Sequence, residues 1–179
     1  GEPAADAEGY SGHDGRTTIF DYWSIPSLRA WLNGGRCNGK VSDSVRSLRK
    51  TYARILQLCN SEAAIREGRF FDLMYVNYHN PSLNPHREFA FIRATDDELI
   101  LIAVSFDNFD KQLAINIPAH AFETLGFPQG KAKMKELLGG GRSVSKELSA
   151  DTPFVTKLPA HGAVIWKTRR SDIISHVKK

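Results

Sequence analysis

Glu98-Leu99-Ile100-Leu101-Ile102-Ala103-Val104-Ser105-Phe106 is the stretch of this 179-residue sequence that decides the fold. Its apolar side chains run almost without interruption, whereas a strand with one face in water alternates apolar and polar residues. Turn-forming residues bound the run on both sides, at 95–97 and 107–110. The sequence therefore predicts that residues 98–106 form a central strand that is covered on both faces.

Shorter stretches with strand character surround this central strand. Residues 87–94 place Phe89 and Phe91 on one face and Ala90 and Ile92 on the other. The remaining candidates, separated by turn residues, are 70–76, 111–117, 133–138, 143–148, 154–158 and 163–168. Short strands at this spacing are typical of an antiparallel β-sandwich. We therefore predict a mainly β fold, a Greek-key-like sandwich of about eight strands.

An amphipathic helix precedes the strands. Ser42 is a good N-cap, and apolar residues then recur at steps of three and four, which predicts a helix over 43–59. Residues 63–67 add a further turn, which Gly68 ends. A helix with one apolar stripe must bury it, so we expect the stripe to dock on the sandwich or on a second copy of the chain. The residues of this stripe are Leu48, Tyr52 and Ile55, with Cys59 expected as a buried thiol.

The segment before this helix reads as a long loop, with a short helix expected to begin at 24–27 and to end at Asn33. The chain starts Gly1-Glu2-Pro3 without an initiator methionine, which leads us to expect a fragment of a larger protein. We divide it into loop and helices at 1–68, the sandwich at 69–168 and a charged tail at 169–179.

Composition excludes several classes of function. The net charge of +4 comes from dispersed basic residues, which favours a solvated surface over a nucleic-acid site. The two cysteines show no Cys-x-x-Cys spacing, so neither a zinc site nor a disulfide framework is expected. No stretch approaches the roughly 20 apolar residues of a membrane span. We expect no cofactor, no nucleic-acid partner and no membrane partner.

The sequence offers no convincing catalytic or metal-binding set. Gly139–Ser143 lacks the Gly-Lys-Ser/Thr ending of a phosphate loop, and Asp96–Glu98 reads as a solvated turn rather than a calcium loop. The six histidines show no His-x-His or His-x-x-x-His spacing, and no Gly-x-Ser-x-Gly supplies a nucleophile. Asp107 and Asp110 flank a turn, so we expect both side chains to face water. We therefore predict no catalytic residue and no metal site.

Aromatic residues are the remaining candidates for binding. Tyr22 and Trp23 directly follow Asp21. Aromatic rings of this kind either stack on sugars or anchor a loop to a hydrophobic core. A second group that could bind carbohydrate consists of Tyr75, Tyr78 and Trp166, if their rings are exposed.

Residues 15–167, taken in order, resemble the C-terminal part of an α-amylase-family glycoside hydrolase, and the resemblance covers nearly the whole chain. Gly1–Glu2 with its Gly/Ala-rich loop looks like the segment after the eighth barrel strand of that family. Gly15–Trp23 (GRTTIFDYW) and Leu48–Tyr52 (LRKTY) look like the loop and helix that close the (β/α)8 barrel. Leu137–Gly140 (LLGG) and Leu158–Lys167 (LPAHGAVIWK) look like the β-sandwich that follows it, often called domain C.

This resemblance implies retaining glycosidase chemistry in the parent enzyme, carried by an Asp nucleophile, a Glu acid and a second Asp. All three lie upstream in the family, and none maps onto this sequence, so hydrolysis by this chain is not expected. The resemblance implies that Asp21, Tyr22 and Trp23 border the substrate-binding face and that the catalytic barrel is the sandwich's partner. We rank three hypotheses for the function of this chain. An accessory, stabilising domain comes first, an α-glucan-binding module second and a nucleic-acid-binding domain third. The identity of the α-glucan, and the choice between hydrolysis and transglycosylation, stay open.

Overall fold

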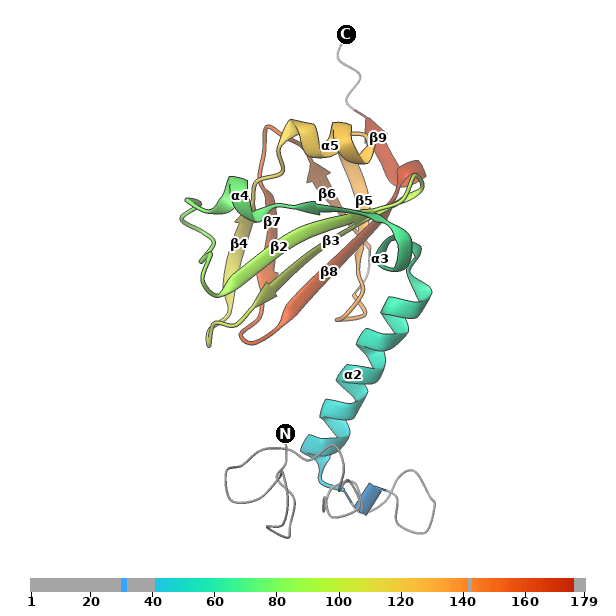
Figure 1. Ribbon diagram of the computed structural model, residues 1–179, viewed down its shortest axis with the longest axis vertical. Helices are drawn as coiled ribbons and strands as arrows, with labels where there is room; N and C mark the ends of the chain where they lie inside the picture. The colour runs from blue at the N-terminus through green and yellow to red at the C-terminus, as the bar shows by residue number, and fades with distance from the viewer. Residues whose placement is uncertain (1–29, 32–40, 142, 176–179) are drawn as a thin grey trace, which may run out of the picture. The chain divides into compact units, whose positions relative to one another are not determined.

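The computed structural model describes residues 30–31, 41–141 and 143–175 (Figure 1). Contacts within the chain divide it into two compact units, residues 1–53 and 54–179. The division lies inside helix α2 (Asp43–Ser61), earlier than the boundary after residue 68 that the sequence suggests. The short helix expected to begin at 24–27 lies outside the described residues except for residues 30–31, which are helical.

Helix α2 confirms the helix that the periodicity predicts, and α3 (Ala63–Glu67) confirms the additional turn. The hydroxyl of Ser42 accepts a hydrogen bond from the Val45 amide at 3.4 Å, as expected of an N-cap.

The apolar stripe of α2 is placed differently from the prediction. In the first unit, Leu48 and Tyr52 are exposed. In the second unit, Ile55 is exposed and Cys59 is only partly buried, while Leu58 is buried against the sheet. The expected docking of Ile55 on the sandwich is therefore wrong. The last turns of α2 meet the sheet through Leu58, which lies three positions further on.

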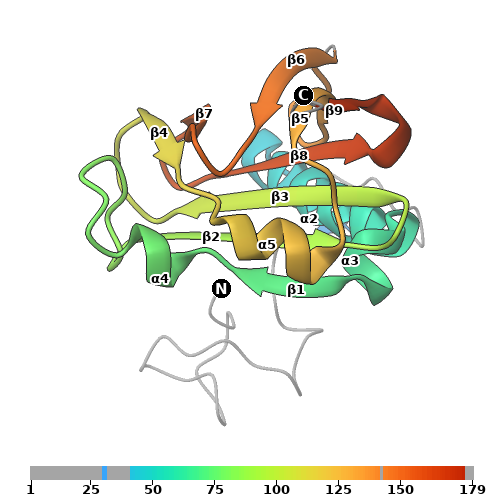
Figure 2. The same cartoon turned by 90° about the horizontal axis from the view of Figure 1, so that it is seen from above.

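The second unit contains two antiparallel sheets, which confirms the mainly β, sandwich-like fold. The main sheet has the order β1–β2–β3–β8–β5–β6, with β9 paired to β5, and a second sheet pairs β4 with β7 (Figures 1 and 2). The strands are β1 (Arg69–Asp72), β2 (Glu88–Ala94), β3 (Glu98–Ser105), β4 (Lys111–Ile115), β5 (Gly130–Glu136), β6 (Val144–Leu148), β7 (Phe154–Leu158), β8 (Ala163–Arg169) and β9 (Ile173–Ser175).

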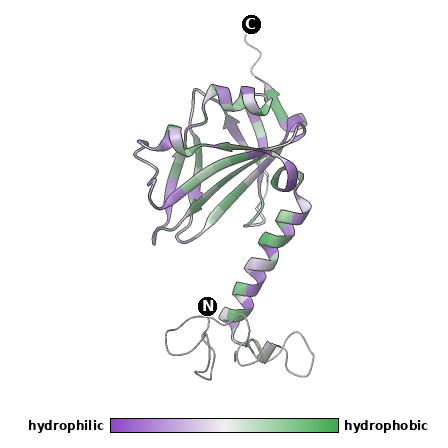
Figure 3. Cartoon of the chain, in the orientation of Figure 1, coloured by the Kyte–Doolittle hydropathy of each residue, from purple (hydrophilic) through white to green (hydrophobic). Residues whose placement is uncertain are grey.

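Strand β3 is covered on both faces, as its sequence predicts. Leu99, Leu101 and Ala103 belong to the larger core, which lies between the two sheets and includes Leu113 of β4 and Phe154 of β7. The alternate side chains of β3 belong to a smaller core on the opposite face. That smaller core consists of Leu58, Ala64, Ile100, Ile102, Leu137 and Ile165. Apolar residues accordingly dominate the central strands in Figure 3.

Two short helices, α4 and α5, differ from the sequence-based prediction. The strand expected at 70–76 ends at Asp72, and α4 (Met74–Asn77) follows it. The carboxylate of Asp72 accepts a hydrogen bond from the Met74 amide at 2.8 Å, and this local bond turns the chain out of the strand. Helix α5 (Ala119–Leu125) was not predicted; it starts after Pro118 and ends at Gly126, whose φ of 61° suits glycine.

The expected charged tail at 169–179 is largely structured where it is described. Arg169 completes β8, a single 3-10 turn, η4, spans Arg170–Asp172, and β9 pairs with β5. The reason is the apolar pair Ile173 and Ile174, of which Ile173 packs against the larger core. Residues 176–179 lie outside the described residues.

Candidate interaction surfaces

The site residues predicted from the sequence, Asp21, Tyr22 and Trp23, lie outside the described residues. Their substrate-binding role therefore stays a prediction, and the candidate surfaces below all belong to the second unit.

An ionic network joins α3 to the main sheet. The ammonium of Lys167 lies 2.5 Å from a carboxylate oxygen of Glu62 and 2.6 Å from one of Glu98. The other oxygen of Glu98 accepts a hydrogen bond from the Ala64 amide at 2.7 Å. Arg93 donates to the carbonyls of Ala64 and Ile65 at 3.1 and 3.0 Å. These contacts satisfy backbone groups of α3 and hold it on the sheet.

The network is not a glycosidase acid pair. Burial by itself raises the pKa of Glu98, but the hydrogen bonds from Lys167 and from the Ala64 amide, with the charges of Lys167 and Arg169, hold this pKa below its usual value. Burial likewise lowers the pKa of Lys167, and its bonds to Glu62 and Glu98 outweigh burial and raise it. A general acid in glycoside hydrolysis needs a raised pKa, so Glu98 has the wrong shift for that role.

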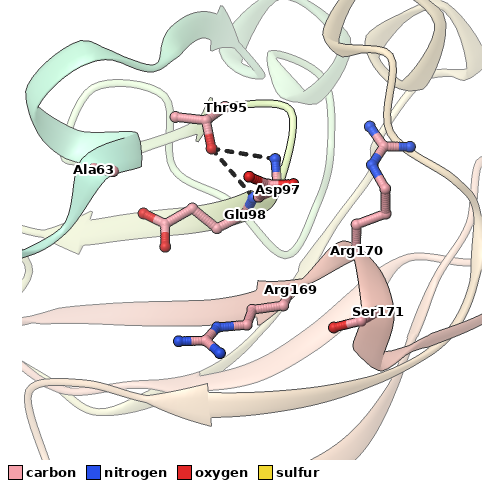
Figure 4. A pocket seen from close by; sticks show the side chains of 7 residues that line it. All are labelled: Ala63, Thr95, Asp97, Glu98, Arg169, Arg170 and Ser171. Atoms are coloured by element: carbon pink, nitrogen blue, oxygen red, sulfur yellow. Dashed lines mark hydrogen bonds between the residues drawn. The ribbon is translucent and has the colours of Figure 1, made fainter.

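A hollow of about 600 Å³ lies beside this network (Figure 4). Its wall includes Thr95, whose hydroxyl accepts hydrogen bonds from the Asp97 and Glu98 amides at 3.4 and 3.2 Å. Arg170 is engaged in the fold, since it donates to the carbonyls of Asp96 and Gly126 and its guanidinium lies 5.0 Å from the Phe127 ring centroid. The Thr95 hydroxyl thus stabilises the turn between β2 and β3, and Arg170 links this turn to the end of α5.

An aromatic patch occupies the outer part of the main sheet. Phe70 of β1 and Phe89 of β2 are 51% and 41% exposed. The ring centroid of Phe91 lies 5.5 Å from each of theirs. Phe91 and Val104 of β3 also pack against the smaller core, so the patch continues the apolar face on which Leu58 and α3 lie. We call Phe70, Phe89, Phe91 and Val104 the docking face.

A second aromatic group lies on α4, on the two residues that follow it and on α5. Tyr75 and Tyr78 are 54% and 52% exposed. The Tyr75 hydroxyl lies 2.7 Å from Nε2 of His120 on α5, and the His120 ring packs edge-on against Phe71 at 5.1 Å. Tyr78 lies edge-on to His79, also at 5.1 Å.

Two sequence-based expectations about single residues are wrong. Trp166 is partly buried against the larger core rather than exposed, and its indole donates to the Thr156 hydroxyl at 2.9 Å. Asp107 does not face water, since it is 5% exposed and its carboxylate lies 3.6 Å from the Arg87 guanidinium.

The described ranges contain neither a metal-binding cluster nor a membrane-spanning helix. There, no three His, Cys, Asp or Glu side chains are grouped so that they could hold a metal ion. No helix in the described part has the length and apolar character that crossing a membrane requires.

Sequence comparisons give no relative: no protein-family model matches the chain, and no curated protein matches it either. Solved structures do match. AmyP in complex with maltose is 12% identical, with a TM-score of 0.51 over 94% of this chain and 29% of that chain. This chain shares its fold with part of an α-amylase-family enzyme.

Two α-amylases match over similarly small shares of their own length. The Anoxybacillus α-amylase is 17% identical over 82% of this chain and 26% of that chain, with a TM-score of 0.49. The Geobacillus thermoleovorans α-amylase complexed with acarbose is 14% identical over 80% and 28%, with a TM-score of 0.49. The chain thus spans between a quarter and a third of the length of each of these enzymes. The resemblance expected from the sequence is confirmed as a likeness of fold.

Proposed function

We propose that residues 69–168 are the accessory, stabilising β-domain of an α-amylase-family enzyme that acts on α-glucans, and that this chain is not catalytic in isolation. The fold shared with part of AmyP supports this proposal. The observation that carries it is the docking face, because it supplies the surface through which such a domain would bind a larger partner.

The chemistry of the docking face suits a dry protein contact. Its side chains are hydrocarbon only, and two of the three phenylalanine rings are about half exposed. Contiguous apolar patches of this kind are rare on soluble monomers and mark interaction sites. The same face of the sheet already accepts Leu58 of α2 and Ala64 of α3. We infer that the partner is the catalytic (β/α)8 barrel, whose outer ring of helices can continue this packing.

Three largely buried carboxylates of the described residues support the proposal that this chain is not catalytic by itself. Glu62 and Glu98 share the Lys167 ammonium, and the Glu88 carboxylate is paired with Lys111 at 2.9 Å. A retaining glycosidase needs one carboxyl as nucleophile and another as acid, both facing the sugar. These buried acids instead stabilise the fold.

Replacing Phe70 and Phe89 together with asparagine should reduce the fluorescence of an apolar-surface dye bound to the chain, since the docking face is an exposed aromatic patch among the described residues. The free energy of unfolding should change by less than about 1 kcal/mol, because both rings are already partly in water. Dye fluorescence and urea unfolding measure the two quantities.

The matched control is Phe109→Asn, which removes a ring of similar exposure, 55%, that is not one of the four residues of the docking face. It should leave dye binding nearly unchanged. Equal dye binding by the wild-type chain and by the Phe70/Phe89 double variant would show that this patch is not an accessible apolar surface.

A second copy of the chain is the other protein partner that the sequence suggests, through Leu48 and Tyr52 of α2. Both side chains are exposed, at 60% and 63%, which supports keeping this proposal. Light scattering that finds a monomer at all concentrations would exclude it.

A further inference from the structure

The two exposed aromatic groups of the second unit differ in chemistry. The docking face presents phenylalanine rings without a polar atom. The group on α4 and α5 presents two tyrosines and two histidines, which combine flat apolar rings with hydrogen-bonding edges. Sugars show the same combination, an apolar ring face bordered by hydroxyl groups, and tyrosine matches both parts.

Tyr75 is held in place before any ligand arrives. Its hydroxyl is bonded to His120, and His120 rests on Phe71, which is 9% exposed and part of the larger core. Tyr75 and Phe71 also lie in ring contact at 6.3 Å. A side chain braced in this way loses little rotamer freedom on binding, and this lowers the cost of stacking.

Tyr78 adds a second ring at the neighbouring position of the same turn. Residues 74–77 are helical and Tyr78 continues with helical dihedral angles, φ −59° and ψ −36°. Residues three apart in a helix lie on one side, with Cβ atoms about 5–6 Å apart. Two half-exposed rings at neighbouring positions can contact two successive sugars of one oligosaccharide.

This aromatic pair lies on the side of the sheet opposite to the docking face. Phe70 and Phe71 are adjacent in β1, so their side chains point to opposite faces of the sheet. Phe70 belongs to the docking face, whereas Phe71 contacts both Tyr75 and His120. A barrel bound to the docking face would therefore leave the tyrosines accessible.

We propose that Tyr75 and Tyr78, with His120 as positioning residue, form a surface site for an α-glucan oligosaccharide. The choice of an α-glucan rests on the proposed function; the presence of a carbohydrate site rests on the tyrosines alone. Burial and the negative charge of Asp72 raise the pKa of Tyr75, which favours the protonated phenol.

Calorimetric titration of the 179-residue chain with maltoheptaose tests the site. The wild-type chain should bind, and Tyr75→Ala or Tyr78→Ala should each weaken binding about 5-fold, as expected for the loss of one stacked ring. The Tyr75→Ala/Tyr78→Ala double variant should show no heat. Tyr75→Phe keeps the ring and should weaken binding less than Tyr75→Ala. His120→Ala should weaken maltoheptaose binding, while its circular dichroism spectrum should match that of the wild-type chain and so show an intact fold.

The control variant Phe106→Ala removes a ring that is 67% exposed and distant in sequence from both tyrosines, and it should bind like the wild type. No binding by the wild-type chain, or equal binding by the double variant, overturns the proposal. Cellohexaose serves as the second ligand. Binding of cellohexaose but not maltoheptaose, lost in the double variant, would overturn the choice of an α-glucan. The Phe70/Phe89 double variant should titrate like the wild type, which separates this site from the docking face.

Discussion

Replacing Lys167 with methionine should lower the free energy of unfolding by about 3 kcal/mol, because removal of one partner leaves buried charges without compensation. The three side chains concerned, Lys167, Glu62 and Glu98, are only 20%, 14% and 12% exposed. Without the ammonium, the carboxylates of Glu62 and Glu98 would share one poorly hydrated site and repel each other. The contact between α3 and the sheet would weaken as a result.

The free energy of unfolding of the wild-type chain should depend on pH in a defined way. The pKa of Glu98 is lowered in the folded chain, so its contribution is present above its usual value of 4.5 and is lost as the pH falls through the folded pKa. The pKa of Lys167 is raised, so its contribution is present below its usual value of 10.5 and is lost as the pH rises through the folded pKa. Wild-type stability should therefore be highest between these limits.

The Lys167→Met variant should differ most from the wild type near neutral pH and approach it in acid, where protonation removes the repulsion between the two glutamates. Urea unfolding from pH 3 to pH 9 measures this difference. Lys157→Met is the matched control, because Lys157 is exposed on β7, and it should change the free energy by less than about 0.5 kcal/mol. A constant difference between Lys167→Met and wild type over this range would mean that the ion pairs contribute nothing.

Shortening a buried side chain on either face of β3 should lower the free energy of unfolding. Leu101→Ala removes a fully buried side chain from the larger core, and Ile100→Ala does the same in the smaller core. Each should lower the free energy of unfolding by about 2–5 kcal/mol, the sum of lost burial and the cavity left behind. Thermal and urea unfolding of the purified variants measure the loss.

Ile174→Ala makes the same chemical change on β9, where the side chain is 74% exposed, and should be nearly neutral. If Ile100→Ala proved as mild as Ile174→Ala, the smaller core would not be closed by Leu58 and Ala64 in solution. The comparison thus tests whether the second face of the sheet is covered by the chain's own helices.

The central part of the fold could be predicted because its signals are local. Continuous apolar sequence at 98–106 and alternation at 87–94 identify β3 and β2, and the N-cap at Ser42 identifies the start of α2. Helix α5 could not be predicted in the same way, because seven residues are too few to show a helical period; only Pro118 and Gly126 mark its ends.

The candidate surfaces were harder to predict because they depend on which face of a strand is covered. Alternation shows that Phe89 and Phe91 share a face, but only the fold shows that α3 and Leu58 cover part of that face, so that Phe91 is partly buried and Phe89 stays 41% exposed. Tyr75 and Tyr78 were recognised as candidates, while a strand was expected to continue to residue 76. The local bond from the Met74 amide to Asp72 converts that stretch into a helical turn and brings both tyrosines to the surface.

The central claim is that this β-domain serves a larger enzyme acting on α-glucans, and antibodies raised against residues 69–168 test it most directly. Extracts of the native source should lose α-glucan-consuming activity when treated with these antibodies, and the precipitate should contain a polypeptide larger than the 20.0 kDa chain. The account would be contradicted if the antigen occurred only at the size of the chain while all the activity stayed in solution.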